Sequence, residues 1–482
     1  MTALVATWPH PDRPNDQPSL DALFEAGRAT RGAIVDGDRR FEAAGLDDVA
    51  ARLAGSLRRR GVGRGDTVAW QSVNRWEAVA LFRACWRLGA VAAPVHHLAG
   101  PAELDHILAG LDPALVVDPD QVATWAEQGE PVAPGVARPA DLAVVLHTSG
   151  STGSPKGVLH THAGLAYKAR LMAGIHGLVP GDAVLMPAPL AHISGLQNAV
   201  TLPGAAGLTT VLMARWDPDR ALDLIEEHHI TFMIGPPTFF ISLRDAAGFR
   251  PERVASLRLI YSGGAGVTAA FVAEATEQFG AVVKRTYGST EAPTVTTSYA
   301  GDDPDRARHT DGRPTGSVQL RLGPDGELWV RGPELFVGYT DPVRTAEAVV
   351  DDWFRTGDLG HIDSDGWLTI TGRLKDLIIR GGENISAAEV EGALEAHPWV
   401  RQAVAVGQPD RRLGERVCAF VVCAPGHRLD LETCGAWFAE RGVARFKTPE
   451  VVVVVDELPL LAAGKIDRAE LTRRAAGLAG PS

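Results

Sequence analysis

Residues 147–157, with the sequence HTSGSTGSPKG, most constrain what this chain can fold into. Residues 142–146 before them are apolar and partly β-branched, which predicts a buried strand leading to the edge of a sheet. Glycines let backbone N–H groups turn toward an anion, hydroxyls add donors, and Lys156 adds a positive charge. The segment is not a Walker A loop, because Gly157 follows Lys156 where that loop has serine or threonine. It predicts a polyphosphate-binding loop, with a flexible surface loop as the ordinary alternative.

The composition describes a large globular chain with several domains. With 482 residues and 45% hydrophobic content, the chain can bury enough surface for two or more domains. A net charge of −12 with scattered Lys and Arg argues against nucleic acid or an anionic membrane as a main partner. Residues 183–214 contain no charged side chain, but Pro and Gly interrupt them. This favours a buried core around a ligand over an integral membrane segment.

The cysteines and the N-terminus indicate the compartment. The four cysteines form no CxxC pair and have no spacing with histidine that suggests a metal site. Residues 1–20 contain no basic region followed by an apolar run, so a secretory signal is not expected. We therefore expect a reduced, cytoplasmic protein.

Short β-branched runs alternate with amphipathic stretches, for example residues 66–73, 76–88 and 90–95. This order predicts the α/β class. A boundary is expected near Gly372, where strand-like residues lead into GRLKD and then a Gly-Gly turn. We expect a large N-terminal α/β domain of several subdomains over residues 1–372 and a small C-terminal α+β domain over residues 373–482.

Two further segments carry groups suited to a nucleotide. Residues 287–292 (YGSTEA) offer an aromatic ring, hydroxyls and a carboxylate, which suit a base, a phosphate and Mg²⁺. The alternative is a glycine turn beside a buried tyrosine. Asp358 ends the segment WFRTGD just past a glycine, where it can accept from both hydroxyls of a ribose. The alternative is an aspartate that binds its own turn backbone.

Three basic residues follow in the C-terminal quarter. Arg373 and Lys375 suit either a nucleotide contact or a solvated linker, and Lys465 (in PLLAAGK) lies near the C-terminus, where a lysine is usually solvated. Taken alone, residues 287–292 suit both interpretations about equally, whereas Asp358 and Lys465 favour their ordinary alternatives. Their occurrence in one particular order argues against all of these alternatives jointly.

From about Phe41 to Leu471 the chain resembles the adenylate-forming superfamily of acyl-CoA synthetases, adenylation domains and luciferases, and most closely the acyl-CoA ligases. The resemblance rests on residues 65–68 (GDTV), 148–157, 189–192 (PLAH), 262–265 (SGGA), 287–291, 355–358, 372–389, 407–410 (GQPD), 414–415 and 464–465. It implies an acid–thiol ligase that works in two steps. A carboxylate attacks the α-phosphate of ATP to give an acyl-adenylate and pyrophosphate, and a thiol then displaces AMP.

The resemblance also implies where the nucleotide binds. The loop from Thr148 to Lys156 would hold the β- and γ-phosphates, and Thr152 and Glu291 would lie close to Mg²⁺. Tyr287 would stack on adenine, and Asp358 would bind the ribose. The full set of predicted nucleotide-binding residues is Thr148, Ser149, Gly150, Ser151, Thr152, Gly153, Lys156, Gly264, Ala265, Tyr287, Gly288, Asp358 and Arg373.

Catalysis and domain motion are implied in the same way. Lys465 would bridge the substrate carboxylate and the α-phosphate. The small domain would be mobile and would rotate about a hinge at Lys375. The other predicted catalytic residues are His192, which would gate the thiol unless it is an ordinary core histidine, Thr290 at the α-phosphate, and Glu291. After rotation a CoA tunnel would be lined by Gly381, Gly382 and Glu383.

The acyl pocket is expected to be neutral. Its predicted residues are His192, Ile193, Leu196, Phe239, Gly263 and Ala292. The segments that should line it, residues 186–198, 234–241, 261–267 and 292–297, contain no Lys, Arg, Asp or Glu. Because an unpaired buried charge is costly, a neutral apolar acid of the fatty, alicyclic or aromatic kind is favoured.

We expect ATP, Mg²⁺, CoA and a small carboxylic acid as ligands. Free CoA is the expected acceptor, because no carrier domain follows Lys465 in this sequence. One alternative is a stand-alone adenylating enzyme that loads a separate acyl-carrier protein or an amine. Another is a non-catalytic nucleotide-binding protein on the same fold, which the presence of Lys465 disfavours because a binder does not need it. The oligomeric state cannot be predicted from this sequence.

Overall fold

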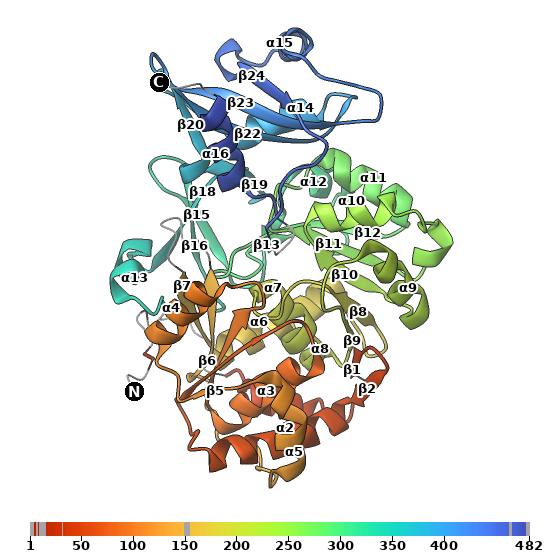
Figure 1. Ribbon diagram of the computed structural model, residues 1–482, viewed down its shortest axis with the longest axis vertical. Coiled ribbons are helices and arrows are strands. Elements are labelled where there is room, and N and C mark those ends of the chain that lie inside the picture. Colours follow the sequence, from red (N-terminus) through yellow and green to blue (C-terminus); the bar gives the residue numbers. More distant parts are fainter. Residues whose placement is uncertain are drawn as a thin grey trace.

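The computed structural model describes residues 4–5, 8, 16–30, 32–148, 155–461 and 465–478. Within these residues the chain forms four sheets with helices packed around them. Figure 1 shows a large lower body built from the N-terminal elements, and a smaller upper body built from β20 onward. The predicted α/β class, with a large N-terminal and a smaller C-terminal part, is confirmed.

The largest sheet has nine strands and is mostly parallel. Its order is β14 (Arg313–Pro314), β13 (Thr296–Thr297), β12 (Val282–Tyr287), β11 (Leu259–Gly263), β10 (Phe232–Gly235), β8 (Ala183–Met186), β9 (Thr209–Leu212), β1 (Ala33–Asp36) and β2 (Arg39–Glu42). Because β10, β11 and β12 run parallel, their carboxyl ends meet at one edge of the sheet. Ligands of open α/β sheets bind at such an edge.

A second sheet of five strands lies in the same lower body. Its order is β5 (Leu115–Val116), β3 (Thr67–Ser72), β4 (Val91–His96), β6 (Leu142–Thr148) and β7 (Lys156–Thr161). Strands β3, β4, β5 and β6 run parallel, and β7 turns back antiparallel to β6. The predicted phosphate loop therefore connects β6 to β7.

Two further sheets are mostly antiparallel. The third consists of β15 (Gln319–Leu322), β16 (Glu327–Arg331), β18 (Trp353–Ile362) and β17 (Val349–Val350), with β19 (Leu368–Arg373) on β18. The fourth consists of β21 (Glu383–Ser386), β20 (Leu377–Arg380), β23 (Gly414–Cys423) and β22 (Val400–Asp410), with β24 (Val451–Val454) on β23. The chain leaves the third sheet at Arg373 and enters the fourth at Leu377. The predicted domain boundary at residue 372 falls next to this crossing and stays a prediction.

The helices of the described residues cover these sheets. In the N-terminal part they are α1 (Leu20–Ala26), α2 (Ala43–Arg59), α3 (Trp76–Leu88), α4 (Pro101–Leu111), α5 (Val122–Gln128), α6 (His162–His176), α7 (Ile193–Gly195), α8 (Leu202–Ala206), α9 (Pro218–His228), α10 (Pro237–Asp245), α11 (Ala269–Phe279), α12 (Pro304–His309) and α13 (Pro342–Ala348). In the C-terminal part they are α14 (Ala387–Glu395), α15 (Leu431–Glu440) and α16 (Arg468–Leu478).

Local sequence sets where the helices begin and end. Helix α6 begins after Thr161, whose hydroxyl accepts from the backbone N–H of Gly164 at 3.2 Å, and it ends at Gly177 in the left-handed conformation. Its sequence then places Leu165 and Met172 in the largest hydrophobic cluster, together with Trp86 of α3. This packing of helices against the sheets fixes the strand ends on which the site is built.

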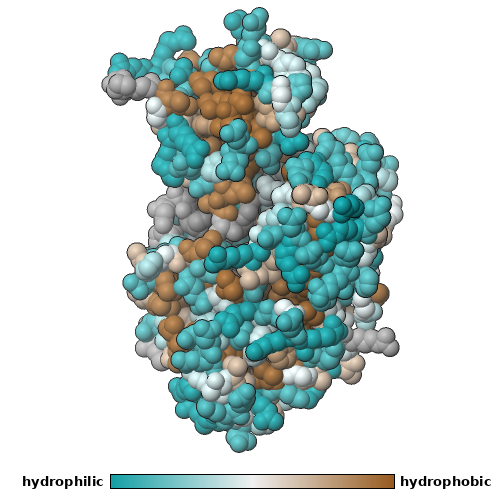
Figure 2. Space-filling view, turned by 45° about the vertical axis from the view of Figure 1, so that its right-hand side comes forward, coloured by the Kyte–Doolittle hydropathy of each residue, from teal (hydrophilic) through white to brown (hydrophobic). Residues whose placement is uncertain are grey.

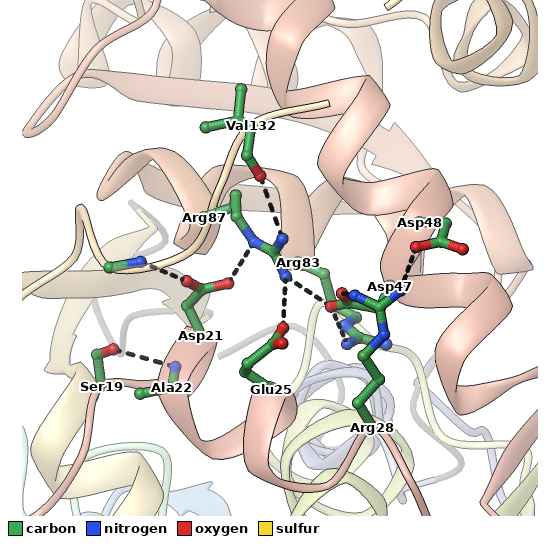
Figure 3. Close-up of polar contacts among 11 residues, drawn as sticks. Ser19, Asp21, Ala22, Glu25, Arg28, Asp47, Asp48, Arg83, Arg87 and Val132 are labelled. Atoms are coloured by element: carbon green, nitrogen blue, oxygen red, sulfur yellow. Dashed lines mark hydrogen bonds and ion pairs between the residues drawn. The ribbon is translucent and has the colours of Figure 1, made fainter. Parts of the chain in front are cut away.

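Asp47 of α2 lies at the centre of a buried ionic network (Figure 3). Its carboxylate accepts hydrogen bonds from Arg83 at 2.8 Å, Arg87 at 2.6 Å and Arg28 at 3.1 Å. Arg87 also donates to Asp21 of α1 at 2.7 Å. Because these buried charges pair with one another, the network ties α1, α2 and α3 together and serves the fold.

The surface bears hydrophobic residues on the smaller upper body, where they gather on the face seen in Figure 2. Inside this body, Phe420 of β23 packs in a buried cluster with Val404 of β22 and with Leu458, which follows β24. Among the described residues, no helix is both long and apolar enough to cross a membrane. Residues 183–214, which lack charged side chains, form short elements of the N-terminal core.

Candidate active site

Asp358 and Arg373 face each other across the antiparallel strands β18 and β19. The Arg373 Nε lies 2.7 Å from Oδ1 of Asp358, and the Tyr287 hydroxyl donates to Oδ2 at 2.7 Å. Burial and the nearby Asp358 carboxylate raise the pKa of Tyr287 well above its usual range. The phenol therefore stays protonated at neutral pH and remains a donor. The structure thus joins three predicted nucleotide-binding residues in one cluster.

The backbone around Asp358 is fixed by neighbouring polar groups. Asp358 lies inside strand β18, and Gly357 before it has a φ of +72°. The Gly357 N–H donates to the Glu327 carboxylate at 3.0 Å, and the Asp358 N–H donates to the Thr356 hydroxyl at 3.0 Å. These contacts hold a carboxylate that is only 4% exposed.

Lys465 reaches this region from the C-terminal part of the chain. A Cβ atom placed on Gly264 would lie 3.1 Å from Cε and 3.3 Å from Nζ of Lys465, and Gly264 has a φ of +75°. Burial lowers the pKa of Lys465, as do the neighbouring Arg373 and Lys375, while Asp358 opposes them. Lys465 thus has two cations and one carboxylate near it, which makes this place electropositive and complementary to phosphate.

Glu291 and Lys156 both lie near Tyr339. The Tyr339 hydroxyl donates to Oε1 of Glu291 at 2.7 Å, and the Lys156 Nζ lies 5.4 Å from the centre of the Tyr339 ring. Lys156 is the first residue of β7 rather than part of a loop, and it pairs with Thr148 of β6. The strand pair thus brings Thr148 and Lys156, the two ends of the predicted phosphate loop, next to each other.

Part of that loop lies outside the described residues. The predicted contacts there are Ser149, Gly150, Ser151, Thr152 and Gly153. Thr290 follows β12 and is buried, and its carbonyl oxygen lies 2.8 Å from Nε2 of His160. Gly288 lies next to it, and a Cβ atom there would approach the Thr294 nitrogen to 2.5 Å, so only glycine fits. Ala265, beside Gly264, is exposed.

His192 caps the short helix α7. Its Nδ1 accepts from the backbone N–H of Ser194 at 3.2 Å, which leaves the ring proton on Nε2. Burial lowers the pKa of His192 to about 3, with Lys465 and His96 adding to the effect. At neutral pH this ring is therefore a neutral hydrogen-bond donor beside Lys465.

The predicted acyl-pocket residues do not pack as one cluster. Ile193 and Leu196 belong to the central N-terminal core, whereas Ala292 packs in a separate cluster with Phe336. Phe239 stacks on Trp216 with 4.5 Å between ring centres. Gly263 packs against Thr286, since a Cβ atom there would lie 2.3 Å from Thr286 Cγ2. The pocket assignment stays a prediction.

Sequence reasoning missed a buried polar pair formed by Tyr261 of β11 and His176 of α6. Tyr261 lies two residues before Gly263, and its ring lies 4.5 Å from that of His176. Among the described residues, neither the Tyr261 hydroxyl nor the two His176 nitrogens have a hydrogen-bond partner. Burial, with Lys284 and Lys168 nearby, lowers the pKa of His176 to about 3. No local sequence pattern marks these residues, because strand register and helix packing bring them together.

The predicted hinge and CoA segment lie on the surface. Lys375 is exposed in the short helical turn Leu374–Asp376, between β19 and β20. Gly381 and Gly382 form the two-residue turn between β20 and β21 with φ values of +60° and +93°, as such a hairpin turn requires. Glu383 beside them is exposed. In this arrangement Lys465 is the C-terminal group that lies against Gly264.

Comparison with known proteins identifies this arrangement. The family model for AMP-binding enzymes matches residues 24–340, and the model for their C-terminal domain matches residues 389–465. The chain belongs to the AMP-binding enzyme family. This AMP-binding enzyme is 33% identical over 492 residues to the medium-chain fatty-acid–CoA ligase of Escherichia coli strain K12, covering 90% of this chain and 86% of the relative.

Two more relatives cover the AMP-binding enzyme almost completely. The indoleacetate–CoA ligase of Aromatoleum aromaticum is 34% identical over 477 residues, covering 90% of this chain and 93% of the relative. Among solved structures, ATP-bound MatB from Rhodopseudomonas palustris superposes with a TM-score of 0.86 at 29% identity, covering 95% of this chain and 99% of that one. The resemblance predicted from the sequence motifs is confirmed.

Proposed function

We propose that this AMP-binding enzyme is an AMP-forming acyl-CoA ligase. A carboxylic acid and ATP give an acyl-adenylate and pyrophosphate, and the CoA thiol then gives acyl-CoA and AMP. The observation that carries the proposal is the position of Lys465 against Gly264, beside the cluster of Asp358, Arg373 and Tyr287. A protein that only binds nucleotides does not need a half-buried lysine from its C-terminal part at this place.

In the first step a carboxylate oxygen forms a bond to the α-phosphorus, and the bond to the bridging oxygen of pyrophosphate breaks. Two anions must approach each other, so catalysis depends on neutralising and orienting them. Lys465 is desolvated and lies near two other cations, which favours an anion beside it. Asp358 would accept from the ribose hydroxyls while Tyr287 and Arg373 hold it in place.

A Mg²⁺ ion fits the residues near the phosphates. Glu291 is a half-buried carboxylate with one oxygen bound by the Tyr339 hydroxyl, and oxygen ligands of this kind suit Mg²⁺. When bound, the ion would neutralise phosphate charge. Thr152, the other predicted ligand, lies outside the described residues. The Lys156 Nζ lies 5.4 Å from the centre of the Tyr339 ring, and its positive charge would bind phosphate oxygens.

In the second step the sulfur of CoA forms a bond to the acyl carbon, and the bond to the AMP oxygen breaks. The thiol is a good nucleophile and the adenylate a good leaving group, so no enzymic nucleophile is needed. We propose that rotation at Lys375 withdraws Lys465 and brings Gly381 and Gly382 to the site. Support comes from the exposed turn at Lys375, which links two separate sheets. The neutral His192 would then donate a hydrogen bond near the reacting carbonyl.

The acid is proposed to be neutral and largely apolar. Ile193 and Leu196 are buried in the hydrophobic N-terminal core, and Tyr261 and His176 are uncharged at neutral pH. A second carboxylate on the substrate would therefore lack a dedicated partner among them. The relatives named for a medium-chain fatty acid and for indoleacetate support a fatty or aromatic acid.

The test is pyrophosphate release with Mg-ATP across short fatty, alicyclic and aromatic acids, each with and without CoA. The proposal expects one class of acid to give multiple turnovers only with CoA and to yield a thioester. A single burst of pyrophosphate that CoA leaves unchanged would contradict CoA as the acceptor. Reactions without acid provide the background.

A further inference from the structure

Backbone pairing fixes the described residues next to Lys465. Leu460 and Ile466 form an isolated β-bridge, and the Leu461 N–H donates to the Lys465 carbonyl at 2.6 Å. The Asp467 N–H donates to the Pro459 carbonyl at 2.8 Å. These bonds join residues 459–461 to residues 465–467. They do not fix the position of Lys465 relative to the rest of the C-terminal part, so another contact must do so.

Arg468 supplies that contact. As the first residue of α16, it places Nη2 at 2.6 and 2.7 Å from the two carboxylate oxygens of Glu391 on α14. Its Nη1 donates to the Ala405 carbonyl of β22 at 3.1 Å. The same Glu391 carboxylate accepts from the Ala405 N–H at 2.8 Å. Arg468 is thus held by two elements at once, with charge-assisted bonds.

The acidic side of this contact is half-buried. The side chain of Glu391 is 14% exposed, and burial raises its pKa while Arg468 lowers it. Glu395, one helical turn later, accepts from the Ala403 N–H at 3.2 Å. Burial raises the pKa of Glu395 to about 7, Glu391 adds to this effect, and Arg468 opposes it. Arg468 is the cation that compensates both carboxylates, so its position is strongly determined.

We propose that the ion pair of Arg468 and Glu391 is a positioning device that holds Lys465 in place for adenylate formation. Arg468 lies three positions after Lys465, so their Cα atoms are at most about 11 Å apart. A shift of Arg468 against α14 and β22 is therefore passed to the lysine. The proposal rests on the proposed ligase function. It assigns Arg468 and Glu391 no contact with substrate.

The two half-reactions distinguish positioning from general stability. In Arg468→Met, the kcat of adenylate formation should fall about 10-fold to 100-fold, since an error of about 1 Å in a reacting group can cost that much. The KM for ATP should stay nearly unchanged, because Asp358, Arg373 and Tyr287 bind it. Thioester formation from a supplied acyl-adenylate should keep its wild-type rate, because Lys465 is not needed there.

Two companion variants sharpen the test. Arg468→Lys keeps the charge and should recover part of the adenylation rate. Arg473→Met is the matched control, since Arg473 lies on the same helix in an exposed pair with Glu470 at 2.6 Å. It should behave as wild type in both half-reactions. If Arg468→Met does not fold, Glu391→Gln is measured in its place. Glutamine is neutral and has the same shape as glutamate, so this variant should show the same selective loss.

Three outcomes would overturn the inference. They are unchanged adenylation in Arg468→Met or Glu391→Gln, an equal loss in both half-reactions, or the same selective loss in Arg473→Met. Failure of the proposed function has a different signature. In that case the wild-type enzyme itself forms no adenylate from any acid, or no thioester from a supplied adenylate.

Discussion

Asp358 and Arg373 are opposite each other on β18 and β19, with Nε of the arginine 2.7 Å from Oδ1 of the aspartate. Arg373 is the last residue of β19, and β20 of the next sheet begins four positions later at Leu377. The predicted ribose contact is therefore physically joined to the connection on which domain rotation is proposed to depend.

Replacing Asp358 by asparagine should raise the KM for ATP. The amide removes the charge that faces Arg373 and weakens acceptance from the Tyr287 hydroxyl and a ribose. We expect an increase of about tenfold or more, as for the loss of a charge-assisted hydrogen bond. Pyrophosphate release at varied ATP measures it. Asp365→Asn, in an exposed pair with Arg306, is the control and should change nothing. An unchanged KM in Asp358→Asn would remove the ribose assignment.

Replacing Lys375 by proline should slow thioester formation more than adenylation. Proline fixes φ near −65° and restricts the residue before it, so the turn between the two sheets loses freedom. If this turn is the hinge, passage to the second arrangement becomes rate-limiting. Single-turnover measurements of each half-reaction give the ratio. Lys375→Ala, which keeps backbone freedom, should retain both rates. Wild-type rates for both steps in the proline variant would contradict the hinge.

Acidification should destabilise the fold through buried histidines such as His162. Its Nδ1 accepts from the Leu20 N–H at 3.3 Å, and burial lowers its pKa to about 4 from 6.5. Between these values the unfolded chain binds the extra proton, so stability is lost as pH falls from 6.5 toward 4. His162→Gln should flatten this dependence by up to about 1.4 kcal/mol per pH unit.

Urea unfolding at pH 7, 6 and 5 measures this slope. His309→Gln changes an exposed histidine and serves as the control. Equal slopes for wild type and His162→Gln would show that His162 does not carry the effect.

The sequence predicted the elements with strong local patterns. Residues 76–88 were expected as one amphipathic stretch and form helix α3 (Trp76–Leu88), because their apolar positions recur at helical spacing. The α/β class followed from the alternation of such stretches with β-branched runs. The loop motif that includes Lys156 was recognised from residue types alone, although Lys156 itself is the first residue of β7.

The remaining parts of the site depend on contacts between distant residues. Tyr339 binds Glu291 across 48 positions of the chain, and Tyr261 meets His176 through strand and helix packing. Neither contact has a local signature, so neither was predicted. The acyl pocket was placed from the resemblance. In the structure Phe239 packs on Trp216, whereas Ala292 packs in a separate cluster. Such packing depends on volumes that a single sequence does not reveal.

The position of Lys465 against Gly264 is the central claim, and Lys465→Ala tests it most directly when both half-reactions are measured on the same protein. The account predicts that the rate of adenylate formation, measured as pyrophosphate release, falls about 100-fold or more, as for removal of a charge that stabilises a transition state. Thioester formation from a supplied acyl-adenylate should stay close to wild type. Lys447→Ala, which removes a lysine paired with Glu389 in the same part of the chain, should leave both reactions unchanged. Equal loss of both half-reactions in Lys465→Ala, or unchanged adenylation, would contradict the account.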